Sequence, residues 1–200
     1  MLDPTQLAQR LTAMAQTGLA FSKDRYDIER YQELMEIAAS LVTEGVAPLV
    51  HVMREQTGYA TPKVDVRALV VRDGRVLLMQ EPEDGLWSLP GGWADVGDRP
   101  SLAVEREVRE ETGLLVRATR LLSLWDGNLR NYPLGVFHAY KLFFLCEEIG
   151  GELQTGIDSL GVGFFAINEL PALSACRVVA SQIQDCLRAA AAPAAATEFD

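Results

Sequence analysis

One stretch of the chain constrains its fold more than any other: a glycine-rich loop that leads directly into an acidic helix. Apolar residues at helical spacing predict a helix over residues 101–112, and Gly113 ends it. Glu107, Glu110 and Glu111 stand at positions i, i+3 and i+4, so their carboxylates share one face of this helix. The chain must therefore fold so that a row of negative charge is either solvated or compensated.

Other residues of this helix indicate how it is held. Val104 and Val108 lie one turn apart and predict the side that packs into a core. Arg106 precedes Glu110 by four residues, and we expect it to be a structural partner of the carboxylates. Clustered carboxylates repel one another unless a cation compensates, and hard oxygen ligands without Cys or His favour Mg²⁺ or Mn²⁺ over zinc. A plain solvated acidic face is the alternative interpretation of this helix taken alone.

The loop ahead of the helix favours a binding site. It begins with Leu89-Pro90-Gly91-Gly92 and continues through Asp95, Gly97 and Asp98. Glycines let the backbone approach a ligand closely, and the two aspartates add further carboxylates. Loop and helix together therefore predict an oxygen-rich site.

The rest of the chain predicts helices followed by a mixed α and β region. Helical spacing occurs at the N-terminus and again near the C-terminus, over residues 4–18, 26–45, 48–53 and 174–188. Asp3 is placed to cap the first of these helices. Apolar runs and alternation predict strands over residues 64–70, 76–79, 114–124, 136–146 and 162–167. Asp73-Gly74 predicts a tight hairpin between the first two strands.

The stretch from Gly92 to Leu114 resembles the box of the Nudix family. That box reads glycine, five residues, glutamate, seven residues, then Arg-Glu-aliphatic-x-Glu-Glu-x-Gly-aliphatic. Gly92 and the run Arg106 to Leu114 fill the pattern, and Asp98 stands where the family usually has glutamate. The resemblance implies an α/β/α sandwich around a mixed sheet in a hydrolase domain over residues 61–188. A helical N-terminal extension, residues 1–60, would precede it, and a flexible tail, residues 189–200, would follow.

The resemblance also implies a reaction: hydrolysis of a diphosphate linkage by water, assisted by Mg²⁺ or Mn²⁺. Glu107, Glu110 and Glu111 would be catalytic residues and metal ligands, and Glu107 would also orient or deprotonate water. Asp158 is the candidate for a further catalytic acid from a loop outside the box. The alternatives for that role are other acidic residues of the same region, Glu147, Glu148 and Glu152.

The N-terminal extension resembles that of a Nudix subgroup acting on nucleoside diphosphates linked to another group. The resemblance is carried by residues 16–19, 26–31 and 58–67. It implies a small-molecule substrate of the ADP-ribose or CDP-choline type, with a nucleoside monophosphate and a phosphorylated moiety as products. In that subgroup the extension is associated with dimerisation, so we expect a homodimer. The sequence leaves ADP-ribose and CDP-choline as equal alternatives.

Charge and cysteine usage exclude several other classes of protein. The 18 basic and 28 acidic residues give a net charge of −10, which argues against nucleic-acid or membrane-surface binding. No apolar run reaches the length of a membrane span, and no signal peptide is recognisable. Cys146, Cys176 and Cys186 lack metal-ligand spacing and are expected to be reduced thiols of a cytoplasmic protein.

Two other functions remain open from the residues. One is a pyrophosphohydrolase that removes damaged nucleoside triphosphates, and the other is a Nudix-like sensor that binds a nucleotide without turnover. The retained box glutamates favour an enzyme over a sensor. Among the remaining side chains, Trp93 and Tyr132 are candidates for lining a substrate pocket, whereas His51 and His138 lack partners for nucleophilic or zinc chemistry.

Overall fold

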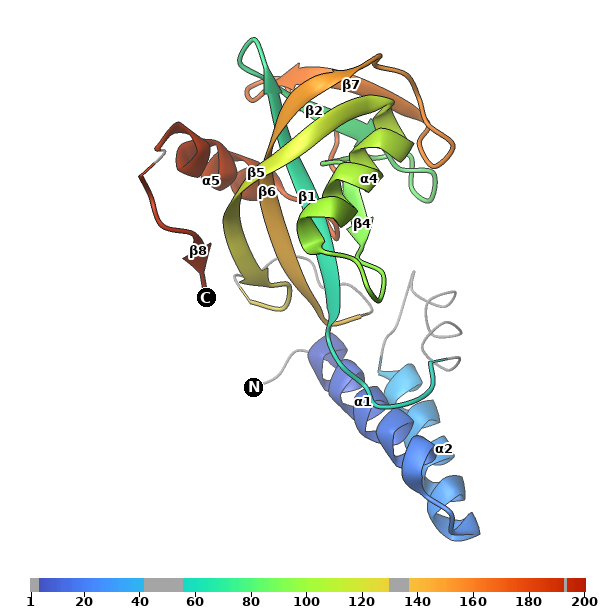
Figure 1. The fold of residues 1–200 in the computed structure, drawn as a ribbon. Coiled ribbons are helices and arrows are strands. Elements are labelled where there is room, and N and C mark those ends of the chain that lie inside the picture. Colours follow the sequence, from blue (N-terminus) through green and yellow to red (C-terminus); the bar gives the residue numbers. More distant parts are fainter. Residues whose placement is uncertain (1–3, 42–55, 130–136, 193) are drawn as a thin grey trace. The chain divides into compact units, whose positions relative to one another are not determined.

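The computed structural model of the chain describes residues 4–41, 56–129, 137–192 and 194–200 (Figure 1). The chain forms two compact units, Met1–Lys63 with Leu134–His138 and Val64–Pro133 with Ala139–Asp200. The N-terminal helices belong to the first unit, and the acidic helix belongs to the second. The domain boundaries given above stay a prediction.

Two helices, α1 (Pro4–Phe21) and α2 (Arg25–Ser40), lie side by side in the first unit (Figure 1). Asp24 caps α2 by accepting hydrogen bonds from two backbone N–H groups of its first turn. A side chain at Gly18 would meet the ring of Tyr31 at 2.4 Å, so this glycine lets the two helices approach closely. The expected cap Asp3 and the helix at 48–53 lie outside the described residues.

The second unit is built around an eight-stranded sheet with the order β3-β2-β1-β6-β5-β8, in which β4 pairs with β1 and β7 pairs with β2. The strands are β1 (Lys63–Arg72), β2 (Arg75–Gln80), β3 (Trp87–Ser88), β4 (Gly91–Trp93), β5 (Leu114–Asp126), β6 (Ala139–Gly151), β7 (Gly161–Ala166) and β8 (Glu198–Phe199). Strand β8 runs parallel to β5, whereas β2 and β4 run antiparallel to β1, so the sheet is mixed as expected.

The hairpin between β1 and β2 forms at the predicted position. Asp73 and Gly74 have φ angles of 50° and 71°, the left-handed conformation that two-residue hairpin turns require. Arg72 and Arg75 face each other across this turn. The local sequence therefore sets the pairing of the two strands on which the site is built.

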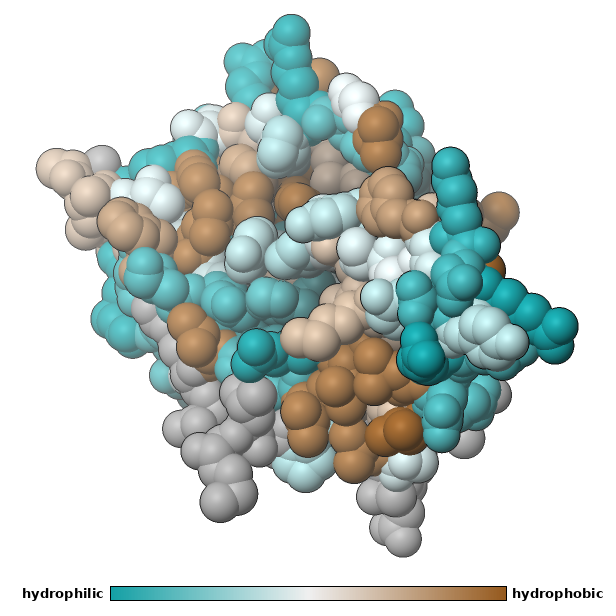
Figure 2. Space-filling model, turned by 90° about the horizontal axis from the view of Figure 1, so that it is seen from below, coloured by the Kyte–Doolittle hydropathy of each residue, from teal (hydrophilic) through white to brown (hydrophobic). Residues whose placement is uncertain are grey.

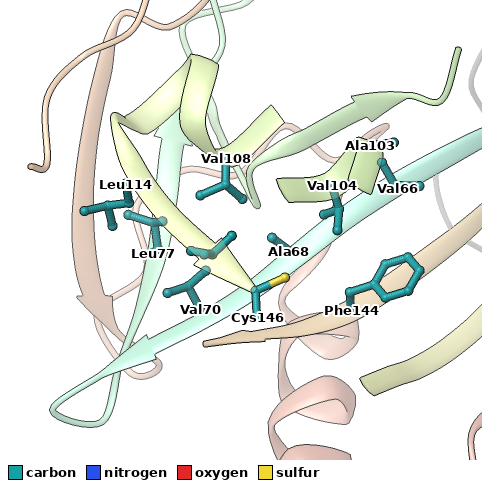
Figure 3. Packing of buried hydrophobic residues seen from close by; sticks show 11 residues of the cluster. Val66, Ala68, Val70, Leu77, Ala103, Val104, Val108, Leu114, Phe144 and Cys146 are labelled. Atoms are coloured by element: carbon teal, nitrogen blue, oxygen red, sulfur yellow. The ribbon is translucent and has the colours of Figure 1, made fainter. Parts of the chain in front are cut away.

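Helices α4 (Pro100–Thr112) and α5 (Ala180–Ala191) pack against the sheet through two separate hydrophobic clusters. In the first cluster, Val104 and Val108 of α4 point toward apolar residues of β1 and β6 (Figure 3). In the second, Ile183 of α5 packs with residues that include Leu69 of β1 and Trp125 of β5. Because neighbouring positions of β1 serve the two clusters, the helices cover opposite faces and the α/β/α sandwich is confirmed.

The C-terminal part differs from the prediction. Helix α5 begins at Ala180 rather than Ser174, since residues before it form turns, and it continues to Ala191. The expected tail at 189–200 contains β8, which pairs with Ser123 and Leu124 of β5. Periodicity could not predict this pairing because a two-residue strand carries no pattern of its own.

Apolar side chains also reach the surface. On the face drawn in Figure 2 they form patches between polar residues. Within the described part of the chain, no helix is long and apolar enough to cross a membrane.

Candidate active site

The acidic helix α4 is fixed at both ends by residues suited to those positions. Pro100 occupies its first turn, where a missing N–H group is harmless. Gly113 ends the helix in the left-handed conformation with φ 72°, and its N–H bonds to the carbonyl of Arg109. With Val104 and Val108 buried, the carboxylates of Glu107 and Glu110 remain on the side away from the core.

Arg106 gathers the carboxylates on the more exposed side of the helix. Its Nη1 lies 3.0 Å from both Glu107 Oε1 and Glu110 Oε2. Its Nη2 lies 3.5 Å from Asp98 Oδ2 and 3.7 Å from Asp95 Oδ2. The structure thus gives Arg106 the structural role expected from its spacing. Asp98, which has a shorter side chain than the usual glutamate, reaches the guanidinium only at this longer distance.

Glu111, one turn after Glu107 on the same helix, is buried. Its Oε2 accepts a hydrogen bond of 2.8 Å from the backbone N–H of Gly91. Burial raises the pKa of Glu111 to about 8, although the positive charge of Arg67 and the Gly91 hydrogen bond lower it. This carboxyl group is therefore held in a position where its charged form needs further compensation.

Glu107 packs over the glycine-rich loop. A side chain at Gly92 would lie 3.2 Å from the Glu107 carboxylate, so the glycine leaves room for it. Burial raises the pKa of Glu107, and the neighbouring Arg106 charge opposes the rise. The loop and the helix thus bring Gly91 and Gly92 against two different carboxylates, Glu111 and Glu107.

A loop formed by residues 152–160 closes over the end of α4. The N–H of Gly156 bonds to the carbonyl of Glu111 at 3.0 Å, and the Ser159 hydroxyl donates to the same carbonyl at 2.7 Å. A side chain at Gly156 would lie 1.8 Å from the carbonyl oxygen of Glu110, so backbone meets backbone here. Asp158 is an exposed residue of this loop, and its catalytic role stays a prediction.

The alternatives to Asp158 occupy different positions. Glu147 and Glu148 belong to β6 rather than to a loop, and Glu148 pairs with Arg72 at 2.7 Å. Glu152 lies at the start of the loop, where its backbone approaches Gly113. The ion pair of Glu148 makes it the least suited of the three to act on a substrate.

The remaining candidates are placed as follows. Trp93 ends β4 and is about half exposed, while Tyr132 and His51 lie outside the described residues. The carbonyl of His138 accepts a hydrogen bond from the N–H of Lys63. The three cysteines, Cys146, Cys176 and Cys186, are all free, as expected, and burial raises the pKa of the first and last to about 12.

Sequence analysis missed a group of buried charges beside Glu111. Asp65 and Arg67 of β1 are buried and hydrogen-bonded to each other, and Glu81 is buried next to them. Alternation in β1 marks these positions as the polar face of a strand. The available signal was that Asp65 and Arg67 have opposite charges and lie two residues apart on the same face.

Family models match two parts of the chain. Residues 4–47 match the UDP-X-like, N-terminal oligomerisation domain, and residues 61–182 match the NUDIX domain. The chain therefore belongs to the Nudix family, and it is a Nudix pyrophosphohydrolase.

Several relatives share more than this domain. A protein of Bacillus subtilis (strain 168), YjhB, whose name provisionally assigns it as an ADP-ribose pyrophosphatase, is 41% identical over 180 residues, covering 88% of this chain and 86% of its own. A crystal structure of an ADP-ribose pyrophosphatase from Streptococcus suis 89-1591 has a TM-score of 0.64 and 41% identity, covering 70% of this chain and all of that one. A crystal structure of a UDP-X diphosphatase has a TM-score of 0.66 and 32% identity, covering 98% and 97%.

Nudix hydrolases generally use divalent metal ions. Among the described residues, no group of three acidic, His or Cys side chains is placed to hold a metal ion. Arg106 instead pairs with both Glu107 and Glu110. The chemistry nevertheless fits a hard divalent ion. All the donors are carboxylate oxygens, and burial raises the pKa of Glu107 and Glu111, so a cation beside them would favour their charged forms.

Proposed function

We propose that the chain hydrolyses the diphosphate linkage of nucleoside diphosphates joined to another moiety, with ADP-ribose as the preferred substrate. The main support is the similarity of this chain, over 88% of its length, to the Bacillus subtilis protein YjhB, whose name assigns it to ADP-ribose. Water would attack one phosphorus and break the bridging P–O bond. ADP-ribose and water would give AMP and ribose 5-phosphate.

Glu107, Glu110 and Glu111 would hold a divalent ion, Mg²⁺ or Mn²⁺. When bound, such an ion neutralises charge on the diphosphate and lowers the pKa of water. The chain's own residues position these carboxylates and the loop that carries Asp158. Glu111 is oriented by Gly91, Glu107 is placed over Gly92 to orient water, and the loop carrying Asp158 is fixed to the carbonyl of Glu111.

A substrate panel tests this proposal. The full chain is incubated with Mg²⁺ or Mn²⁺ and ADP-ribose, a UDP-sugar, CDP-choline or nucleoside triphosphates, and the products are separated by chromatography. We expect AMP and ribose 5-phosphate to form fastest. Release of pyrophosphate from triphosphates alone would support the triphosphate pyrophosphohydrolase instead. Nucleotide binding without any product would support the sensor.

A homodimer through the first unit is the second part of the proposal. Leu7, Met14 and Phe21 lie seven residues apart along α1, and all three are exposed. An exposed apolar row at heptad spacing is typical of helices that pack against another helix. The match of residues 4–47 to an oligomerisation domain supports a second copy of the chain as the partner.

Light scattering after size-exclusion chromatography tests the dimer. Met14→Glu places a charge in the apolar row and should produce monomers. Gln32→Glu adds the same charge at an exposed position of α2 outside the row and should leave the dimer intact. Wild-type protein with the mass of one chain would contradict the proposal.

A further inference from the structure

Four ionisable side chains are buried together in the second unit, outside the row of box carboxylates. Asp65 and Arg67 come from β1, Glu81 follows β2, and Lys141 belongs to β6. Burying charges is unfavourable unless they are paired and hydrogen-bonded, and even then the pairs add little stability over an apolar core. A cluster of this kind therefore calls for a role other than stability.

Arg67 is the residue that connects this cluster to the backbone. Its Nε donates to Asp65 Oδ1 at 2.9 Å, and its Nη1 donates to the carbonyl of Leu89 at 3.1 Å. Nη1 also lies 3.7 Å from Glu81 Oε1, which in turn lies 3.0 Å from Nε of Arg177. The planar guanidinium is thus held from several sides at once.

The carbonyl that Arg67 holds belongs to the glycine-rich loop. Arg67 and Gly91 face each other in the pairing of β1 with β4, and the N–H of Ala68 bonds to the carbonyl of Pro90 at 2.8 Å. A side chain at Gly91 would lie 1.9 Å from the carbonyl oxygen of Val66, so the two strands approach as only glycine allows. This backbone carries the N–H group that binds Glu111.

We propose that Arg67 is a positioning residue for Glu111, acting through the backbone of Leu89 to Gly91 and through its own fixed positive charge. The inference rests on the proposed function, in which Glu111 is a metal ligand. Arg67 keeps the Gly91 N–H group directed at Oε2, so Glu111 presents the same carboxylate orientation to an incoming ion. Since arginine keeps its charge at every working pH, this effect needs no protonation change.

A lysine could not make the same contacts. Its ammonium is a single point, whereas Arg67 uses Nε for Asp65 and Nη1 for Leu89 simultaneously. The same strand offers a matched control. Arg72 pairs with Glu148 and lies over the ring of Phe164, at the hairpin end of β1 and with no contact to the glycine-rich loop among its described interactions.

The test compares Arg67→Lys with Arg72→Lys in Mn²⁺ binding to substrate-free protein, measured by electron paramagnetic resonance titration. We expect Arg67→Lys to weaken Mn²⁺ binding roughly 10- to 100-fold, the range for residues that orient metal ligands. Arg72→Lys should bind Mn²⁺ like the wild type. In hydrolysis assays, Arg67→Lys should lower kcat with little change in KM, because burial keeps this side chain from contact with a bound diphosphate.

Glu81→Gln is the second variant, and it tests the positioning role of Arg67 if Arg67→Lys does not fold. It leaves Arg67 in place but removes a charge that holds it, so Mn²⁺ affinity should fall between those of the other two variants. Wild-type Mn²⁺ affinity in folded Arg67→Lys, or in Glu81→Gln where that variant alone folds, would overturn the inference. If the wild type binds Mn²⁺ but hydrolyses no diphosphate, the proposed function fails while the comparison of Mn²⁺ affinities still tests the role of Arg67.

Discussion

Two arginines lie beside the carboxylates of α4, and they differ in how far they are buried. Arg106 has a side chain 29% exposed and pairs with Glu107 and Glu110, whereas Arg67 is 7% exposed and lies behind Glu111. An exposed ion pair is weakened by water and salt and can exchange partners. A buried one is fixed by its hydrogen bonds. The same residue type therefore serves as a replaceable counter-charge on one side and as a fixed support on the other.

The strongest test of the buried side is Glu111→Gln. The amide keeps the shape and can still accept the Gly91 hydrogen bond, but it removes the charge that an ion requires. We expect hydrolysis to fall roughly 10²- to 10⁴-fold with the unfolding free energy unchanged or raised. Steady-state kinetics and thermal unfolding measure the two effects. Glu169→Gln, at an exposed position with no assigned role, is the control, and near-normal turnover in Glu111→Gln would remove Glu111 from the mechanism.

Gly156→Ala tests how the loop at 152–160, which bonds to the backbone of Glu111, supports the buried part of the site. The added methyl group would lie 1.8 Å from the carbonyl oxygen of Glu110, and neither backbone can yield easily. We expect the unfolding free energy to drop by about 1–3 kcal/mol, the usual range for overpacking, together with a loss of turnover. A methyl group at Gly161 would meet the flexible Gln80 side chain at 3.3 Å and the Trp87 ring at an ordinary contact distance of 3.5 Å, so Gly161→Ala should be milder. Equal denaturation midpoints for the two variants would contradict this account.

The pH dependence of metal binding distinguishes the buried carboxyl from the exposed ones. With its pKa raised to about 8, Glu111 holds a proton at neutral pH, and an ion must displace it. The protonated Glu111 adds to the unfolding free energy in full below the ordinary glutamate pKa of 4.5, and this contribution is lost as the pH rises through about 8. We therefore expect Mn²⁺ affinity to increase about tenfold per pH unit below 8 and then to level off. Calorimetric titrations from pH 6 to 9 measure this, and Glu111→Gln should abolish the slope.

Much of the exposed side of the site was predictable from the sequence. The spacing of Arg106 and Glu110 on one helix predicts their contact, because residues four apart on a helix are neighbours. The Asp73-Gly74 hairpin follows from local backbone preferences in the same way. Local patterns succeed where both partners belong to one element.

The buried side depends on pairs far apart in the sequence. Gly91 meets Glu111, Arg67 meets Leu89, and both contacts require the complete sheet. Polar residues in an alternating strand normally indicate a solvent-facing position, so the sequence alone gives Arg67 no role in the site. Opposite charges two residues apart in a predicted strand are the one signal that could have suggested burial, and periodicity alone does not use it.

Arg106→Lys is the counterpart of the Arg67 test on the exposed side. A lysine keeps the positive charge, and exposed pairs of this kind contribute at most about 1 kcal/mol. We therefore expect less than about a fivefold change in Mn²⁺ affinity, the equivalent of that energy. A loss as large as that expected for Arg67→Lys would show that the two arginines do not differ in the way their burial implies.

The smallest effect is expected at Asp98, where the chain departs from the family box. Its carboxylate lies 3.5 Å from Arg106 in a partly exposed position, so the contact is weak. Asp98→Ala should slow hydrolysis less than about fivefold, and Asp98→Glu should bring the carboxylate closer to Arg106 without a large gain. Steady-state kinetics at low and high salt measure both, since screening should diminish any difference. A loss of about a hundredfold in Asp98→Ala would mean that this aspartate contacts the ion or the substrate directly, and the exposed side of α4 would then be as indispensable as the buried one.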